Sequence, residues 1–302
     1  MPHPRLVCLG NLTIDDVVLP DGRERPGCIG GDALYAALAA RLWEPSTEMV
    51  APVGYDFPAP TLGRIKQAGF ALQGLRPRAL PTLHNRVAYA ASGDRSWTLY
   101  ATDEEFHELS PRLGDIPGEF RAAEAFLILA MTLGAQQELL SGLKRTTSAL
   151  VALDPQEDYI AGNETALRRL IGLTDIFMPS AEEVRQLLGH TDWEVAARTF
   201  ADWGSAIVVL KLGSEGCLVY QRDGDRVFRI PALRADVLDA TGAGDCFCGA
   251  FMAALVHGGD LEAAARAGTV AASIAIEGYG AEPMFLATPQ DAARRMTAMP
   301  AD

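Results

Sequence analysis

The sequence has little basic charge and no long apolar run, and both absences restrict its partners. Its 302 residues include 26 Lys and Arg against 39 Asp and Glu, which gives a net charge of −13. An acidic surface repels the phosphates of nucleic acids and anionic lipid headgroups. No apolar run approaches the ~20 residues that span a bilayer, and the stretch after Arg5 is too short for a secretory signal. We therefore predict a cytoplasmic protein with no nucleic-acid or membrane partner.

Cysteine is scarce as well. The five cysteines are scattered, odd in number and without the C-x2-C pairs of zinc sites. Cys246 and Cys248 stand two apart at the start of a predicted helix, so their side chains would point to different faces. We expect them to pack rather than to bind zinc.

The remaining composition is that of a globular protein, with 49% hydrophobic and 22% charged residues. This excludes a disordered or collagen-like chain. At ~150 residues per domain the length allows two domains, and one large α/β layer structure fits equally well.

Short apolar runs alternate with helix-period stretches over most of the chain. RLVCLG is followed by DALYAALAARLW, TEMVAPVG by TLGRIKQAGF, and the same order continues as far as AIVVLKLG. This alternation predicts a mainly parallel sheet with helices on both faces. We further expect a helix from Asp260 through Ile276 and a short final helix.

Residues 12–28 and 82–101 leave this pattern. The second segment alternates like a β-hairpin, with Ser92, Gly93 and Asp94 as its turn. We expect both segments to form a small β-sheet apart from the main layer. It would serve as a lid over a substrate, or it would be an edge extension without that role.

The most informative stretch is Asp239-Ala240-Thr241-Gly242-Ala243-Gly244-Asp245-Cys246-Phe247. Its glycines lack a Cβ, so backbone N–H groups can converge on an anion at a helix N-terminus, where the helix dipole also favours negative charge. A carboxylate at this place suits proton removal from a hydroxyl that attacks a bound phosphoryl group. Alternatively, Thr241 or Asp245 simply caps the helix.

Asp-x-Thr-Gly-Ala-Gly-Asp-x-Phe before an apolar helix resembles the signature of the ribokinase-like carbohydrate kinases, also called the phosphofructokinase-B family. The chain has no G-x-x-x-x-G-K-[ST] loop, which agrees, because that family does not hold phosphate with a P-loop. The resemblance implies an α/β fold: a three-layer sandwich with a mainly parallel central sheet and a small β-sheet lid. Residues 1–302 would form one kinase domain, with the lid at about 12–28 and 82–101.

The resemblance also implies an acceptor site in the first half of the chain. Gly10-Asn11-Leu12-Thr13-Ile14-Asp15 looks like the family's first strand and its substrate-binding Asp, and Gly30-Gly31 like the glycine pair under the lid. Tyr35 stands where the family has Asn, so its ring would offer the acceptor an apolar face, or would pack into the helix–sheet core. The implied acceptor-binding residues are Asn11, Asp15, Gly30, Gly31 and Tyr35.

The second half resembles the family's nucleotide side. Ser180 and Glu183 stand in the Asn-x-x-Glu motif, whose Glu orders water around Mg²⁺; Ser180 replaces the Asn. Asp239 aligns with a monovalent-cation site of some members, which implies K⁺. The implied nucleotide-binding residues are Ser180, Glu183, Lys211, Gly213, Gly216, Thr241 and Thr269.

Together these features predict a kinase that transfers the γ-phosphoryl group of ATP, with Mg²⁺, to a hydroxyl of a sugar or sugar-like small molecule. Asp245 would be the base, and the amides of Gly242, Ala243 and Gly244 would stabilise the developing charge. A nucleoside kinase of the same fold and a non-catalytic relative that binds sugar or nucleotide are the alternatives. A homodimer formed through the lid is a further expectation. The acceptor, the hydroxyl phosphorylated and the nucleotide preference stay open at this level.

Overall fold

The computed structural model describes residues 3–89 and 95–299. Its strands are β1 (Leu6–Leu9), β2 (Thr13–Val18), β3 (Glu24–Gly30), β4 (Thr47–Val53), β5 (Leu75–Pro77), β6 (Leu83–Tyr89), β7 (Arg95–Leu99), β8 (Ala125–Ile128), β9 (Leu150–Leu153), β10 (Ile176–Phe177), β11 (Ile207–Lys211), β12 (Cys217–Gln221) and β13 (Arg226–Ile230). Its helices are α1 (Asp32–Ala40), α2 (Ala59–Gln67), α3 (Asp103–Glu108), α4 (Leu133–Thr146), α5 (Glu164–Ile171), α6 (Ala181–Leu188), α7 (Trp193–Trp203), α8 (Ala243–Val256), α9 (Leu261–Ala275), α10 (Glu282–Leu286) and α11 (Pro289–Ala298).

Nine strands form the main sheet within the described residues, in the order β13-β12-β11-β10-β9-β8-β1-β4-β5. Every neighbouring pair from β11 to β5 is parallel, whereas β12 and β13 pair antiparallel at one edge. The predicted mainly parallel sheet is therefore confirmed. The antiparallel edge strands β12 and β13 follow the last predicted strand, AIVVLKLG, and were not predicted.

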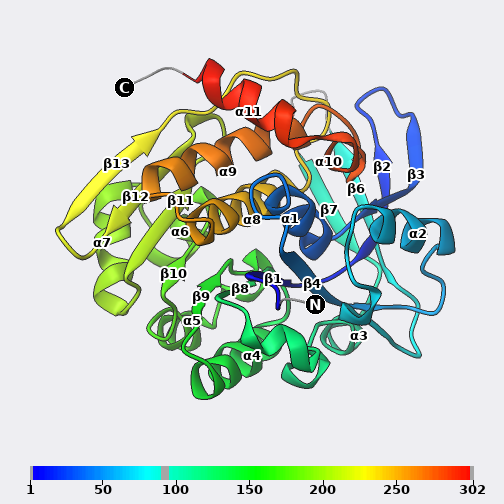
Figure 1. Ribbon diagram of the computed structural model, residues 1–302, viewed down its shortest axis with the longest axis horizontal. Coiled ribbons are helices and arrows are strands. Elements are labelled where there is room, and N and C mark those ends of the chain that lie inside the picture. Colours follow the sequence, from blue (N-terminus) through cyan, green and yellow to red (C-terminus); the bar gives the residue numbers. More distant parts are fainter. Residues whose placement is uncertain (1–2, 90–94, 300–302) are drawn as a thin grey trace.

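Helices cover both faces of this sheet, as the βα alternation predicted. In β1, Leu6 and Cys8 belong to one hydrophobic core, and Val7 and Leu9 belong to the other. The first core packs under α1, α8 and α9, and the second under α4, α5 and α7. Figure 1 shows these two groups of helices on opposite sides of the strands. The protein thus has three layers.

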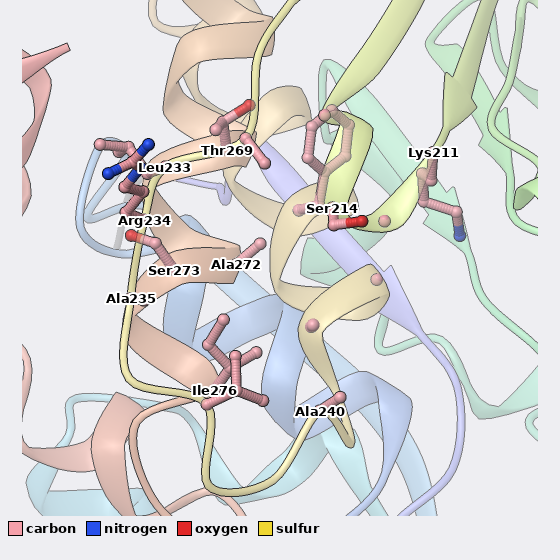
Figure 2. A pocket seen from close by; sticks show the side chains of 17 residues that line it. Lys211, Ser214, Leu233, Arg234, Ala235, Ala240, Thr269, Ala272, Ser273 and Ile276 are labelled. Carbon is pink, nitrogen blue, oxygen red and sulfur yellow. The ribbon is translucent and has the colours of Figure 1, made fainter. Parts of the chain in front are cut away.

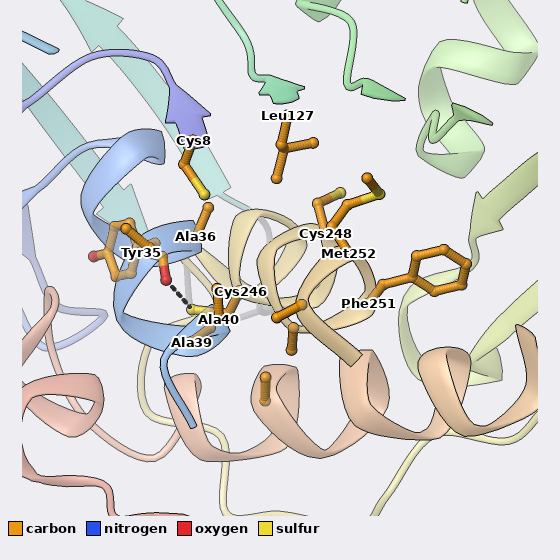
Figure 3. Close-up of a cluster of buried hydrophobic side chains, with 14 of the residues drawn as sticks. Cys8, Tyr35, Ala36, Ala39, Ala40, Leu127, Cys246, Cys248, Phe251 and Met252 are labelled. Atoms are coloured by element: carbon orange, nitrogen blue, oxygen red, sulfur yellow. Dashed lines mark hydrogen bonds between the residues drawn. The ribbon is translucent and has the colours of Figure 1, made fainter. Parts of the chain in front are cut away.

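Helix α8 lies deep in the first of these cores. Gly249 sits so close to α1 that a Cβ there would clash with the backbone of Ala36. The Cys246 thiol donates to the backbone oxygen of Tyr35 at 3.5 Å, and Cys248 is also fully buried (Figure 3). All five cysteines are free, and the predicted packing role of Cys246 and Cys248 agrees with their burial.

A second sheet of four strands, β3-β2-β6-β7, stands apart from the main layer (Figure 1). β2 pairs antiparallel with β3 and parallel with β6, and β6 and β7 form the predicted antiparallel hairpin. These strands lie in the two segments that left the βα pattern, except that β3 continues past residue 28 to Gly30. The predicted turn at Ser92, Gly93 and Asp94 lies outside the described residues. We call these four strands the small sheet.

The predicted helix at residues 260–276 is α9, and the final segment holds two short helices, α10 and α11, where one was expected. None of the helices in residues 3–89 and 95–299 is long and apolar enough to cross a membrane.

We expect Gly249→Ala to destabilise the protein, because its Cβ would push against the α1 backbone at Ala36. Overpacking of a close-packed core costs about 1–3 kcal/mol. Gly63→Ala in α2 is the matched control, since a Cβ at Gly63 meets nothing within 4 Å. The midpoint of urea unfolding should fall for the first variant and stay level or rise for the second. Equal midpoints for the two variants would contradict the close approach of α8 to α1.

Candidate active site

The N-terminus of α8 is formed by the glycine-rich motif. Gly242 precedes the helix with a φ of 77°, and a Cβ on it would clash with the ring of Tyr35. Both facts require glycine here. The N–H of Ala243 donates to the backbone oxygen of Ala240 at 3.3 Å, a long bond within the turn. Binding of a phosphate by this N–H therefore stays a prediction.

A buried ion pair supplies positive charge beside this N-terminus. Lys211 lies at the end of β11, and its Nζ is 2.6 Å from both carboxylate oxygens of Asp154. A Cβ at Gly244 would lie 3.5 Å from the same Nζ. Burial lowers the pKa of Lys211, but the Asp154 carboxylate outweighs it, so the net pKa is raised and the ammonium is kept charged. An anion at the start of α8 would therefore meet both the helix dipole and this cation.

A cavity of about 450 Å³ runs from this N-terminus between α9 and the loop 231–237 (Figure 2). Lys211 lies at one end, while Thr269, Ala272 and Ser273 of α9 face Leu233 and Ala235 across it. Its walls are largely apolar, as a flat heterocycle requires. Of the predicted nucleotide-binding residues, the lining includes Lys211, Gly213, Gly216 and Thr269. We call this space the nucleotide-side cavity.

Ser180 and Glu183 are predicted nucleotide-binding residues outside that lining. They form a capping box at the start of α6: the Glu183 carboxylate accepts from the N–H of Ser180 at 2.5 Å, and the Ser180 hydroxyl accepts from the N–H of Glu183 at 3.3 Å. Burial raises the pKa of Glu183 to about 8, with Lys211 opposing the increase and Asp154 adding to it. Helix capping accounts for the positions of both side chains. The predicted role of Glu183 in ordering water around Mg²⁺ stays a prediction.

A second, smaller cavity of about 80 Å³ lies between the main layer and the small sheet. Asn11 and Asp32 approach it from the main layer, and Asn85 and Trp97 from the small sheet. Its other walls are mostly apolar and include Leu83, Leu99 and Phe106. We call it the acceptor-side cavity.

Asp15 lies next to this cavity rather than in its lining. Its carboxylate accepts from the amide of Asn85 at 2.8 Å and from the hydroxyl of Thr13 at 3.1 Å. Burial raises the pKa of Asp15 to about 6, although these two hydrogen bonds oppose the increase. A Cβ at Gly30 would lie 2.5 Å from the same carboxylate, so the glycine is needed beside Asp15.

Asp245 lies in the first turn of α8, between the two cavities in the sense that it neighbours a lining residue of one and acts electrostatically on a lining residue of the other. It follows Gly244, which lines the nucleotide-side cavity, and its charge is close enough to Asp32 of the acceptor-side cavity to affect it. Burial first, and then the Asp245 charge, raise the pKa of Asp32 well above its usual range. The Asp32 carboxylate accepts from the N–H groups of Asn11 and Ala33 at 2.5 and 2.6 Å. The role of Asp245 as the base stays a prediction.

Tyr35 is 1% exposed and lines neither cavity. Its ring packs between Gly30 and Gly242, and its hydroxyl is buried with no hydrogen-bond partner among the described residues. This placement favours the core interpretation of Tyr35. Gly31, with a φ of 105°, caps α1 against the backbone of Asn11 and Leu12.

Asp239 joins three parts of the protein. Its carboxylate accepts from the N–H of Thr241 at 2.8 Å, from the N–H of Gly280 at 3.4 Å and from the hydroxyl of Tyr89 in β6. Tyr89 also lies 3.1 Å from the Thr241 hydroxyl. A strand of the small sheet is therefore bonded directly to the glycine-rich motif.

Sequence reasoning missed four residues of this site: Asp32, Asn85, Tyr89 and Asp154. Asp154 had a signal, because it directly follows strand β9 at the carboxyl edge of a parallel sheet, where such folds bind ligands. Asp32 directly follows the Gly30-Gly31 pair, which is the signal that could have identified it. Asn85 and Tyr89 had no local signal, since only the pairing of β6 with β2 brings them to the site.

Comparison with known proteins places the chain in a family. Residues 28–288 match the pfkB family carbohydrate kinases. The chain belongs to the pfkB family of carbohydrate kinases. It is a phosphotransferase with an alcohol group of a sugar or nucleoside as acceptor, which confirms the predicted reaction class.

One curated relative and two solved structures are similar to the chain over nearly its whole length. The chain is 29% identical over 281 residues to a cytidine kinase of Thermococcus kodakarensis, covering 91% of this chain and 97% of that protein. Its fold matches the structure of Burkholderia thailandensis nucleoside kinase in complex with inosine, with a TM-score of 0.81, 20% identity, and coverage of 97% and 98%. It also matches Arabidopsis thaliana ribokinase complexed with ribose and ATP, with a TM-score of 0.74, 22% identity, and coverage of 98% and 99%. These likenesses confirm the ribokinase-like fold.

We expect Asp245→Asn to lower kcat by about 10²–10⁴, since the amide keeps the shape of the carboxylate but cannot take a proton. ATP affinity should stay within a few-fold, because the α8 N-terminus and Lys211 remain. Asp236→Asn is the control, since Asp236 is exposed in the loop 231–237. Steady-state kinetics and calorimetric ATP titration check both quantities. Near-wild-type kcat in Asp245→Asn would show that Asp245 is not the base.

We expect Tyr89→Phe to loosen the small sheet from the glycine-rich motif, because it removes the hydroxyl that meets Asp239 and Thr241. A hydrogen bond to a charged group contributes about 1.5–3 kcal/mol, so kcat should fall by roughly 10-fold or more. Hydrogen exchange in β6 should also rise in the presence of acceptor and a nonhydrolysable ATP analogue. Tyr55→Phe is the control, because Tyr55 is 75% exposed. Unchanged exchange and unchanged kcat would show that the contact does not position the motif.

Proposed function

We propose that this protein phosphorylates a hydroxyl of a nucleoside with ATP as the phosphoryl donor. The observation that carries the proposal is the mixed lining of the acceptor-side cavity. Asn11 and Asn85 contribute polar groups to it, while Trp97 and Phe106 add aromatic rings to the apolar remainder. A ribose needs hydrogen-bond partners and a base needs a flat apolar surface, so one molecule with both parts suits this lining.

The relatives support the same choice. The cytidine kinase relative is similar over nearly its whole length, and the Burkholderia nucleoside kinase of the same fold has a structure in complex with inosine. A simple sugar would leave the aromatic rings of the cavity without a partner. A sugar kinase nevertheless stays the second candidate, because the ribokinase neighbour binds ribose on the same fold.

In the proposed reaction, the phosphates of ATP lie at the N-terminus of α8, with Lys211 beside them. Asp245 accepts the proton of the attacking hydroxyl, and the amides of Gly242, Ala243 and Gly244 stabilise the charge that develops on the phosphoryl oxygens. Positioning and charge stabilisation are the main tasks of the protein in this reaction, because the transition state is loose. The adenine would lie against the apolar walls between α9 and the loop 231–237.

The donor chemistry of the site fits Mg²⁺ held mainly by phosphates and water. The described residues contain no group of three or more ligating side chains that could enclose a metal ion. Mg²⁺ commonly keeps several waters and binds through few protein ligands. Glu183 would orient such waters, and the bound ion would neutralise phosphate charge.

We further propose that the small sheet acts as a lid. The acceptor-side cavity of about 80 Å³ is far smaller than the roughly 300 Å³ of a typical ligand pocket. A nucleoside would therefore enter only with the small sheet displaced, and its return would exclude water from the reacting phosphate. Residues 1–302 act as one kinase domain in this proposal.

Three further expectations stay predictions. Asp239 would lie near a K⁺ site, although its carboxylate already accepts three hydrogen bonds from the protein. Two copies would pair through the small sheet as a homodimer, and the protein would be cytoplasmic. Activity with and without K⁺ and the mass of the protein in solution test the first two.

A panel of acceptors tests the proposed function. We expect ADP formation with ribonucleosides such as cytidine and inosine at kcat/KM values at least ten-fold above those for ribose, other sugars, polyols and sugar acids. Only a nucleoside offers both hydroxyls to the amides and a base to the aromatic rings. Trp97→Ala should lower kcat/KM for the nucleosides and leave that for ribose within a few-fold. Preference for a simple sugar would overturn the nucleoside proposal, and ADP formation that no acceptor stimulates would favour a non-catalytic relative.

A further inference from the structure

Two buried amide side chains face the acceptor-side cavity from opposite sides. Asn11 follows β1 in the main layer, and Asn85 lies in β6 of the small sheet. They are 3% and 5% exposed. The carbonyl oxygen of each has no hydrogen-bond partner among the described residues. Buried acceptors of this kind are rare, because a buried polar atom without a partner is destabilising.

The orientation of both amides is fixed by their neighbours. The Asn11 NH₂ group donates to the backbone oxygen of Ala130 at 3.1 Å, and the Asn85 NH₂ group donates to the Asp15 carboxylate at 2.8 Å. Both partners are oxygens that accept hydrogen bonds, so rotating either amide by 180° would set oxygen against oxygen. The two unpartnered atoms are therefore carbonyl oxygens, and a ligand must bring donors to satisfy them.

We propose that Asn85, from the small sheet, binds one hydroxyl group of the acceptor's sugar ring, opposite a second hydroxyl bound by Asn11, whose acceptor-binding role the sequence resemblance already implied. This inference rests on the proposed function and narrows it to ribonucleosides over their deoxy analogues. Two acceptors on opposite walls of a small cavity match two hydroxyls of a ribose, whereas a deoxyribose would leave one oxygen buried and unpartnered. Sites built in this way discriminate strongly against analogues that lack a hydroxyl.

The place of Asn85 links recognition to the lid. Asn11 belongs to the main layer, but Asn85 moves with the small sheet, so both oxygens flank the acceptor only when the small sheet is in place. A hydroxyl bound to Asn85 would hold the small sheet over the acceptor. Asn85 therefore acts as a specificity-determining residue in the closed arrangement.

A competing role for Asn85 is to brace the Asp15 carboxylate. Bracing predicts an equal loss for every acceptor when Asn85 is changed. Hydroxyl reading predicts a loss that depends on which hydroxyl the acceptor carries. The two roles thus differ in discrimination rather than in overall activity.

The test compares cytidine, 2′-deoxycytidine and 3′-deoxycytidine by calorimetric binding in the presence of a nonhydrolysable ATP analogue and by kcat/KM. In the wild type, each deoxy analogue should be at least ten-fold worse than cytidine. In Asn85→Leu, discrimination against one of the two analogues should fall to within about three-fold and discrimination against the other should persist. Asn11→Leu should show the reverse. Arg86→Gln is the control on the same strand, because Arg86 faces solvent and pairs with Glu24.

Several outcomes would overturn the inference. An equal loss of kcat/KM for all three acceptors in Asn85→Leu would show that Asn85 only supports the Asp15 carboxylate. Equal binding of cytidine and both deoxy analogues to the wild type would exclude hydroxyl reading without any variant, which keeps the test valid if Asn85→Leu fails to fold. If nucleosides are inert but ribose is phosphorylated, the proposed function fails on its own. In that case, the kcat/KM values for ribose and 2-deoxyribose in the wild type and in Asn85→Leu decide whether Asn85 binds a hydroxyl.

Discussion

The close packing of α8 against α1 is the constraint on which the rest of the site depends. Gly249 allows the helix to reach the backbone of Ala36, and Gly242 allows its first turn to rest on the ring of Tyr35. A side chain larger than hydrogen at either place would move the helix away. Because the N-terminus of α8 carries Asp245 and the amides that we propose to bind phosphate, its position sets where phosphate and hydroxyl could meet.

The charges around this N-terminus compensate one another. Burial and then the Asp245 charge disfavour the ionisation of Asp32, and Asp154 adds a further carboxylate nearby. Lys211 pairs with Asp154 through two 2.6 Å contacts and remains charged in spite of burial. Lys211 offsets the charge of Asp154, so less net negative charge faces the phosphates that we propose to bind here.

Two side chains of β6, in the small sheet, contact other residues of the site. Asn85 binds Asp15, and Tyr89 binds Asp239 in the glycine-rich motif. Both contacts come from β6, whose register with β2 sets Asn85 opposite Asp15. A displacement of this sheet would therefore disturb acceptor recognition and the phosphate side together, which is the physical basis for treating it as a lid.

The sequence alone determined the α/β alternation, the small sheet and the motif from Asp239 to Phe247, because periodicity and a helix N-terminus are local properties of neighbouring residues. It also identified Asn11, Asp15, Lys211 and Thr269, which line or flank the two cavities. Tertiary structure decided that Tyr35 packs under Gly242, that Asp154 holds Lys211, and that Asn85 faces Asn11 across a cavity. These facts depend on contacts between residues 57 to 207 positions apart in the chain, such as the Lys211–Asp154 and Tyr35–Gly242 pairs, and no local pattern encodes such contacts.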